Sequence, residues 1–263
     1  MNRKYITAGA VLLCILLLLA ACAKAPVTGR RQFLLITEAQ EMQLGTEGYA
    51  EILETSTLSD DDEAVARLRT IGSRIAGVTG EDDYEWEFNL IENDSIVNAF
   101  CMPGGKVAFY TGILELARDD DEIATVMAHE IAHATARHGA ERMTQLLMYQ
   151  LGGIALGEAL KNNRDETMAL AQVAYGVGAT LAYILPYSRK HESEADHIGL
   201  IYMAKAGYDP RAAVRFWKKM QEHYAGQEPP EWLSTHPSSQ TRIDDLERLM
   251  PDALKYYEEY EGD

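Results

Sequence analysis

Apolar residues recur every three or four positions along several stretches of the chain, and this spacing predicts helices. One such stretch is 60–77, whose apolar stripe ends near Gly77. The residues of this stripe are Val65, Leu68, Ile71 and Ile75. Further helices are predicted over 37–54, 119–139, 189–207 and 209–226. A last helix is predicted within 228–250, after its proline-rich start. Residues 146–185 are predicted to form two buried helices joined by a polar loop.

Two stretches near the middle of the chain alternate with period two, which is typical of strands. In residues 84–92, large apolar side chains alternate with polar ones, which predicts a half-buried strand. Residues 96–114 indicate two strands around a turn at Gly104 and Gly105. Together these patterns predict an α+β fold that is mainly α-helical, with a small antiparallel sheet.

The composition excludes some classes of protein. The chain has 263 residues, of which 47% are hydrophobic and 25% are charged, as is ordinary for a globular domain. Its formal net charge is −17 and no basic surface is evident, so nucleic acid is excluded as a partner. The three cysteines are Cys14, Cys22 and Cys101. If the first two belong to an N-terminal signal and its processing site, Cys101 is a lone thiol and no internal disulfide forms.

The N-terminus has the layout of a secretory signal peptide. A basic start at Arg3 and Lys4 precedes a charge-free apolar run that reaches Cys22. The ending LAAC is similar to a bacterial lipobox, which implies that Cys22 becomes the lipidated first residue of the mature chain. An uncleaved membrane anchor is the alternative. The predicted organisation is a lipoprotein signal peptide over 1–21, a lipidated tether over 22–36 and a folded domain over 37–263.

The stretch 126–139, VMAHEIAHATARHG, contains the pattern H-E-x-x-H. On a helix, His129 and His133 lie about 40° apart and one above the other, so both imidazoles can reach one metal ion. Glu130 projects to the same broad side without ligating the metal, and it can take the proton of a zinc-bound water. A polar face on an ordinary helix is the alternative, but the apolar surround and the preceding strand pair favour a metal site.

A catalytic zinc usually has three protein ligands and one open position, so a third ligand is needed. The metzincin pattern is excluded, because it requires a histidine where Gly139 stands and a glycine where Ala136 stands. His138 lies five residues after His133, about 140° further around the helix. We therefore interpret His138 as a polar residue at the end of the helix that points elsewhere.

The segment HESEADHIG contains a better third ligand, Glu192. Asp196 lies four residues later on the same helix face, where it can accept a hydrogen bond from a ligand histidine. Gly199 shares this face and allows close packing against the first helix. Glu194 is the competing ligand, but it points about 200° away from Glu192. A solvated acidic helix end is the alternative interpretation.

These motifs resemble those of the HtpX and CAAX-prenyl-protease family of zinc endopeptidases. Its signature is H-E-x-x-H with a later E-x-x-x-D, found here as HEIAH and, from Glu192, as ESEAD. The segments NAFCMPGGKVAFYTGIL and THPSSQTRI are also similar to the family, and the resemblance covers roughly residues 26–250. It is strongest to the bacterial envelope lipoproteins of the LoiP and BepA kind, without a repeat domain.

The resemblance implies a zincin-like zinc metallopeptidase domain over 37–263 that binds one Zn²⁺ per chain. Its zinc ligands would be His129, His133 and Glu192. Glu130 would be the catalytic base that activates a zinc-bound water.

The resemblance also implies roles around this centre. His236, in the segment THP, would approach the metal as a further catalytic-site residue and restrain activity, whereas a surface loop histidine is the alternative. Asp196 and Arg242 would support the centre from outside the ligand set, with Arg242 anchoring the loop of His236. The strand edge would bind an extended peptide by adding it to the sheet. The expected substrate-binding residues there are Asn98, Ala99 and Phe100.

The function implied is a zinc-dependent endopeptidase that cleaves misfolded or misassembled cell-envelope proteins in periplasmic quality control. The first alternative is a chaperone-like assembly factor for outer-membrane proteins with latent or restrained proteolysis, and a structural lipoprotein without metal is the second. The expected partners are such substrates, the membrane through the N-terminal lipid anchor, and the outer-membrane assembly machinery. The expected location is the periplasmic side of the cell envelope, at the outer membrane.

Overall fold

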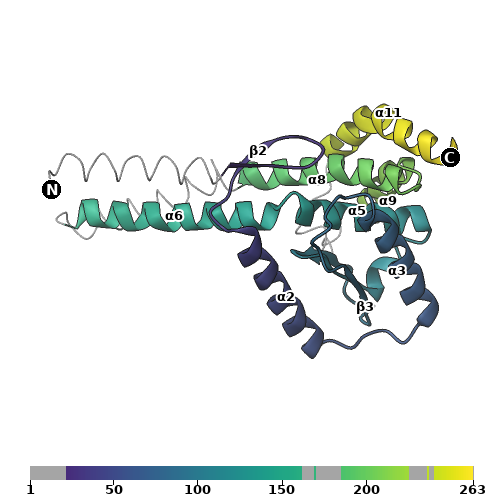
Figure 1. Ribbon diagram of the computed structural model, residues 1–263, viewed down its shortest axis with the longest axis horizontal. Helices are drawn as coiled ribbons and strands as arrows, with labels where there is room; N and C mark the ends of the chain where they lie inside the picture. Colours follow the sequence, from purple (N-terminus) through teal and green to yellow (C-terminus); the bar gives the residue numbers. More distant parts are fainter. Residues whose placement is uncertain (1–21, 162–168, 170–184, 225–235, 237–239, 263) are drawn as a thin grey trace.

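The computed structural model describes residues 22–161, 169, 185–224, 236 and 240–262. The described helices are α2 (Glu38–Thr55), α3 (Asp62–Ala76), α4 (Thr111–Leu114), α5 (Asp120–Thr135), α6 (His138–Leu160), α8 (Leu185–Lys205), α9 (Arg211–His223) and α11 (Gln240–Gly262). The strands are β1 (Cys22–Lys24), β2 (Arg31–Phe33), β3 (Glu87–Ile91), β4 (Ala99–Met102) and β5 (Lys106–Tyr110). The predicted α+β, mainly helical class is confirmed. Figure 1 shows a rounded body from which α6 extends as a long arm.

Capping side chains fix the beginnings of several helices. Thr37 and Gln40 form a capping box at the start of α2, in which each side chain satisfies a backbone N–H of the other. Asp61 caps α3 and Asp119 caps α5 through their carboxylates. The predicted helices over 37–54 and 60–77 are therefore confirmed, with starts set by local hydrogen bonds.

The three-stranded sheet has the order β3-β5-β4. As predicted, β4 and β5 form an antiparallel hairpin, with Gly104 and Gly105 in its turn, both at φ +83°. However, β3 pairs with β5 in parallel, so the sheet is mixed rather than antiparallel. After β3 the chain reverses, and β4 runs antiparallel to β3 at a distance of two strand positions. The strand β5 then lies between them and pairs with both. This order leaves β4 at an edge of the described sheet, next to α5.

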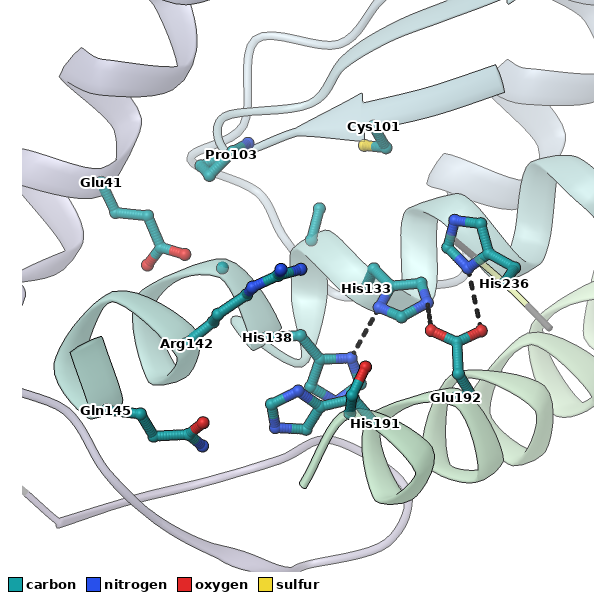
Figure 2. A pocket seen from close by; sticks show the side chains of 13 residues that line it. Glu41, Cys101, Pro103, His133, His138, Arg142, Gln145, His191, Glu192 and His236 are labelled. Carbon is teal, nitrogen blue, oxygen red and sulfur yellow. Dashed lines mark hydrogen bonds and ion pairs between the residues drawn. The ribbon is translucent and has the colours of Figure 1, made fainter. Parts of the chain in front are cut away.

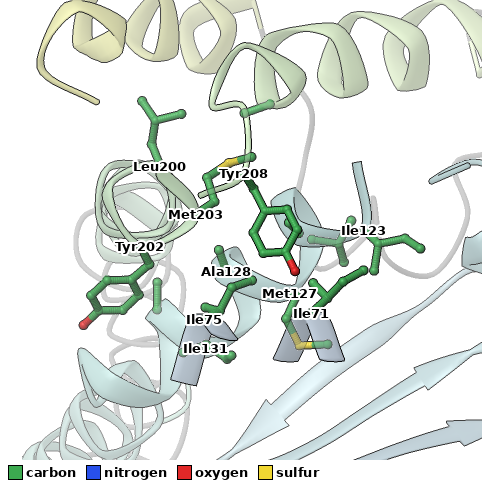
Figure 3. Close-up of a cluster of buried hydrophobic side chains, with 14 of the residues drawn as sticks. Ile71, Ile75, Ile123, Met127, Ala128, Ile131, Leu200, Tyr202, Met203 and Tyr208 are labelled. Carbon is green, nitrogen blue, oxygen red and sulfur yellow. The ribbon is translucent and has the colours of Figure 1, made fainter. Parts of the chain in front are cut away.

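The hydrophobic core surrounds α5, which packs between α3, α8 and the sheet. Figure 3 shows this cluster, in which side chains from three helices meet. Its buried members include Ile71 and Ile75 of α3, Met127 and Ile131 of α5, and Met203 of α8. Because α5 is buried on nearly every side, its polar residues are held inside the molecule rather than on a solvated face.

The helix α8 approaches α5 closely at Gly199. A Cβ atom there would lie 3.0 Å from the backbone C atom of Ala128 and 3.0 Å from the backbone N atom of His129. This is closer than most contacts of a Cβ atom, so a larger residue at this position would push the two backbones apart by a few tenths of an ångström. The predicted close packing of these two helices through Gly199 is therefore confirmed.

Two helix predictions differ from the structure. The helix predicted over 119–139 ends at Thr135, and Arg137 adopts the left-handed conformation with φ 53° before α6 begins. Within 146–185, the described part continues α6 to Leu160 and exposes apolar side chains, such as Leu151 at 58% and Ile154 at 69%, so it is not a buried helix. The rest of that range lies almost wholly outside the described residues. In the part that the structure describes, no helix combines the length and apolar character that crossing a membrane requires.

The segment before α2, for which the sequence suggests a tether, is folded against the body in the structure. The strands β1 and β2 pair in antiparallel register, from Cys22 opposite Phe33 to Lys24 opposite Arg31. The turn between them includes Gly29 at φ +65°, a conformation that glycine tolerates. The limits predicted for signal, tether and domain stay predictions, since residues 1–21 lie outside the described part of the chain.

Candidate metal centre

The helix α5 holds His129 and His133 side by side. Because they are one helical turn apart, their imidazoles lie on one face, and their Nε2 atoms are 3.2 Å apart. The side chain of His129 is 4% exposed and that of His133 is 17% exposed. The more exposed ring of His133 borders a cavity, whereas His129 is enclosed by the core.

The helix α8 brings Glu192 to this pair, as predicted. Its Oε2 atom lies 3.4 Å from Nε2 of His129, and its Oε1 atom lies 3.4 Å from Nε2 of His133. The Nδ1 atom of His236 approaches the same place, 2.8 Å from Oε2 of Glu192 and 3.2 Å from Nε2 of His129. Figure 2 shows Glu192 between the rings of His133 and His236. One donor atom from each of these four residues lies within 4.8 Å of all the others.

The geometry and chemistry of these donors fit zinc. Imidazole nitrogen and carboxylate oxygen are ordinary zinc ligands, and an ion about 2.0–2.1 Å from tetrahedral donors separates them by about 3.3 Å. The separations among His129, His133 and Glu192 are 3.2, 3.4 and 3.4 Å. One ion could therefore bind all three residues with little movement of their side chains.

Two further residues hold the centre from behind. Asp196, on α8, places Oδ1 3.1 Å from Nδ1 of His129, which directs Nε2 of that ring toward the other donors. Arg242 of α11 donates to both oxygens of Asp196, at 2.7 Å each, and its Nη1 lies 3.3 Å from Glu192. The guanidinium also stacks on Trp217, 3.8 Å from the ring centroid. The predicted contact of Arg242 with the loop of His236 falls largely on residues outside the described ones.

Burial and neighbouring charge set the protonation of the centre without metal. Burial would raise the pKa of the Glu192 carboxyl, but the three histidines lower it far below its usual range. Burial lowers the pKa of His133 well below 6.5, although Glu192 opposes this effect. Burial would also lower the pKa of His129, yet hydrogen bonds with Asp196 and Glu192 outweigh it and raise that pKa to about 9. Without metal, the Glu192 carboxylate is therefore ionised and the His133 ring is neutral, so zinc binding would release the extra proton of His129.

Glu130 lies beside the donors but is not one of them. It is 3% exposed, and its Oε1 atom is 3.6 Å from Nε2 of His236. This is the position expected of a carboxylate that acts on a reacting group near the metal rather than on the metal itself.

A cavity of about 340 Å³ opens onto the centre. One side of it is formed by His133, Glu192 and His236, and the opposite side by Cys101 and Pro103, at and just after strand β4 (Figure 2). Its volume is in the range of small-ligand pockets, which is enough for a few residues of a peptide.

Of the predicted substrate-binding residues, Ala99 and Phe100 lie on β4, which borders this cavity, and Asn98 directly precedes it, but none of their side chains lines the cavity. The side chain of Asn98 accepts from the backbone N–H of Ala99, and Ala99 is buried in the core. Phe100 faces the other side of the sheet, where it packs against Tyr49 and Tyr110. Side chains alternate along a strand, so Phe100 cannot face the cleft that Cys101 borders. The role predicted for the three residues stays a prediction.

His138 is a residue whose position the sequence did not reveal. It was interpreted as pointing away, but its Nδ1 atom lies 2.9 Å from Nδ1 of His133. The interpretation assumed a continuous helix, whereas the left-handed turn at Arg137 redirects the chain and brings His138 back toward the motif. The residue at the break is an arginine, and the nearest glycine, Gly139, lies two residues later inside α6, so the sequence does not mark the turn itself. Glu194, the rejected ligand, lies outside the four donors and binds His138 and Arg30.

The fold and the centre together define a class of protein. An H-E-x-x-H helix next to an edge strand, with a carboxylate from a second helix facing both histidines, is the arrangement of a zincin-like metallopeptidase. The family model described as peptidase family M48 matches residues 63–250. The chain belongs to peptidase family M48, whose members are zinc-dependent metallopeptidases. The resemblance and the zinc cofactor expected from the sequence are thereby confirmed.

Several known proteins are similar to this chain. It is 37% identical over 205 residues to the mitochondrial metalloendopeptidase OMA1 of Arabidopsis thaliana, in an alignment that covers 77% of this chain and 40% of that protein. It is 31% identical over 254 residues to the mitochondrial metalloendopeptidase OMA1 of Saccharomyces cerevisiae, with 90% of this chain and 71% of that protein covered. It is 31% identical over 210 residues to the beta-barrel assembly-enhancing protease of Escherichia coli, with 78% of this chain and 43% of that protein covered. The chain thus spans less than half the length of two of these relatives.

These comparisons contradict the location expected from the sequence, the periplasmic side of the outer membrane. Relatives that match most of the chain are mitochondrial enzymes in a plant, in yeast and in human. The expectation came from a charge-free run and the four letters LAAC, a short pattern that carries far less information than an alignment over most of the chain. The comparisons do not support a lipid anchor on Cys22 either.

Proposed function

We propose that this chain is a zinc-dependent endopeptidase that cleaves unfolded or misassembled proteins. The observation that supports this most is the convergence of His129, His133 and Glu192 beside a buried Glu130, at the mouth of a cavity bordered by an edge strand. Membership of a metallopeptidase family supports the class of reaction. The unfolded state of the substrate is inferred from the edge strand β4, with which an extended segment can pair.

In this proposal His129, His133 and Glu192 hold the zinc, and Asp196 orients His129. The zinc would supply Lewis acidity, which lowers the pKa of a bound water and polarises the carbonyl of the scissile peptide. The ionised Glu192 adds one negative charge to two neutral imidazoles, which leaves the ion with a net positive charge for that purpose.

Glu130 would move the proton in the reaction. As general base, its carboxylate takes a proton from the attacking water, and it then donates that proton to the leaving amide nitrogen. Because Glu130 is buried and follows the ligand His129 directly on α5, its carboxylate has little freedom to move away from the reacting atoms.

The strand β4 would position the substrate. It lies at the edge of the described sheet, so an extended peptide can pair with it and run past Cys101 and Pro103 along the cavity. A compact folded protein has no free extended segment to offer, whereas an unfolded or misassembled one has many. The name of the Escherichia coli relative, an assembly-enhancing protease, is consistent with that choice of substrate.

One observation favours a second function, an assembly factor whose proteolysis is restrained. His236 places a fourth donor atom among the other three, whereas a catalytic zinc leaves one position open for water or substrate. With His236 in that position, the centre would be closed to the reacting water.

The variant Glu130→Gln tests the proposed reaction. Zinc content should stay at the wild-type level, because Glu130 is not among the donors. Loss of a general base should reduce cleavage of unfolded casein by about 10²–10⁴-fold. The control is Glu115→Gln, which changes an exposed glutamate shortly before α5 and should leave zinc content and cleavage unchanged. Retained cleavage in Glu130→Gln would rule out this role, and full function of that variant in the cell would favour the assembly factor.

A further inference from the structure

Behind His133, on the side opposite the metal donors, lies a group of buried polar residues from three parts of the chain. We call it the His138 cluster. It consists of His138 and Glu141 of α6, His191 and Glu194 of α8, and Arg30 from the turn between β1 and β2. The rings of His138 and His191 stack with their centroids 4.3 Å apart, and the four residues on helices are each at most 6% exposed.

The cluster reaches the metal centre through a chain of hydrogen bonds. The Nε2 atom of His133 faces Glu192 and His129, so the lone pair for a metal is on that atom. The Nδ1 atom of His133 must then carry the proton, which it donates to Nδ1 of His138 at 2.9 Å. This leaves the proton of His138 on Nε2, which donates to Oε2 of Glu194 at 3.1 Å. The direction of each bond follows from the one before it.

Arg30 fixes the far end of this chain. Its Nε donates to Glu194 at 2.6 Å, while its two terminal nitrogens donate to both oxygens of Glu141 at 2.9 and 2.7 Å. Thr28, in the same turn, donates to the other oxygen of Glu194. All four oxygens of these two carboxylates accept from Arg30 or Thr28, so they are not available as metal ligands even though the cluster holds two histidines and two glutamates.

We propose that His138 and Glu194 are positioning residues that orient His133 as a zinc ligand, and that Arg30 holds this relay in place. The proposal rests on the assignment of His133 as a zinc ligand made above. It gives the two ligand histidines different supports: His129 is oriented directly by Asp196, and His133 indirectly by Glu194 through His138. The relay also links the metal centre to the folding of the turn at residues 25–30 onto α6 and α8.

The test is the zinc affinity of the full chain, measured by competition with a chelating indicator. His138→Ala removes the acceptor for the proton of His133, and loss of such a partner typically weakens metal binding by about 10–100-fold. His138→Asn keeps an acceptor oxygen near the former Nδ1 atom and should restore most of the affinity. Glu194→Gln and Arg30→Gln should give smaller losses. His197→Ala, a half-buried histidine of α8 outside the cluster, should bind zinc like the wild type.

Three results would overturn the proposal. One is wild-type zinc affinity in a folded His138→Ala, with folding checked by circular dichroism of the metal-free protein. Another is the failure of His138→Asn to restore any affinity, because His138 would then act through packing alone. If His138→Ala does not fold, unchanged affinity in Glu194→Gln decides against the relay. If the wild-type chain binds no zinc, the proposed metal site itself is contradicted. That result differs from a failure of the relay alone, in which the wild type still binds zinc.

Discussion

His236 is the single residue that distinguishes a resting from an active metal centre in the proposed mechanism. Its Nδ1 atom lies among the donors, although three other residues suffice to hold a zinc ion. We expect His236→Ala to keep zinc and to cleave unfolded casein faster than the wild type, because the fourth position becomes free. His197→Ala is the matched control. Unchanged or slower cleavage would show that His236 does not restrain the enzyme.

Two residues of the His138 cluster make the metal-free protein sensitive to acid. Burial lowers the pKa of His138 from 6.5 to about 4. Burial would raise the pKa of Glu194, but hydrogen bonds with His138, Thr28 and Arg30 lower it from 4.5 to about 2. Each group binds fewer protons in the folded than in the unfolded state within its window. The free energy of unfolding should therefore fall as pH drops from 6.5 to 4 through His138, and from 4.5 to 2 through Glu194.

Thermal unfolding of the chelator-treated protein across this range is the measurement. His138→Asn removes one of the titrating groups and should reduce the slope of stability against pH between 6.5 and 4. Glu194→Gln should change the slope mainly below pH 4.5. An unaltered slope in His138→Asn would contradict the assigned protonation of the cluster.

The candidate ligands could be found from spacing alone, because residues four apart on a helix share a face. That rule paired His129 with His133, and Glu192 with Asp196, and the structure brings all four together, with Asp196 next to His129. The same rule failed for His138, since it assumes an unbroken helix. It could not place Arg30, whose partners are more than 100 positions away in the sequence.

At the scale of elements, the contact between α5 and α8 determines whether Glu192 reaches the two histidines. Gly199→Ala would place a methyl group 3.0 Å from the backbone of α5, so the helices must separate. We expect a loss of about 1–3 kcal/mol in the free energy of unfolding and weaker zinc binding. Gly139→Ala meets open space and should leave both intact. Stability is measured by thermal unfolding and zinc affinity by competition. If Gly199→Ala and Gly139→Ala had the same stability and zinc affinity, the contact between α5 and α8 at Gly199 would not be tight.

Capping residues and periodicity predicted most elements, because helix starts and alternating strands are written in local sequence. The helices predicted over 37–54 and 60–77 were found, capped by Thr37 and Asp61, and the turn at Gly104 and Gly105 lies where it was predicted. The elements that were missed depend on distant contacts. The parallel pairing of β3 with β5 follows from the order of the strands, and the strands β1 and β2 are held by Arg30 and Gln32 against α6.

At the scale of the whole molecule, the metal centre joins parts of the chain that are far apart in sequence. The helix α5 supplies two histidines, α8 supplies a carboxylate, and α11 supplies Arg242, which binds Glu192 and Asp196 together. The sheet contributes the opposite wall of the cavity. Because these pieces share one core, loss of any of them should affect the centre as well as the fold. The location of the protein is a different matter, for which a short N-terminal pattern was misleading.

The most direct test is the zinc content per chain of the wild type and of Glu192→Gln, measured together with cleavage of unfolded casein. We expect one zinc in the wild type, loss of most of it in Glu192→Gln, and loss of cleavage in parallel, because the variant removes the negatively charged donor among the four donor residues. Glu115→Gln should retain both properties. A wild-type chain that binds no zinc, or a Glu192→Gln chain that binds it and cleaves normally, would contradict the assignment of this centre.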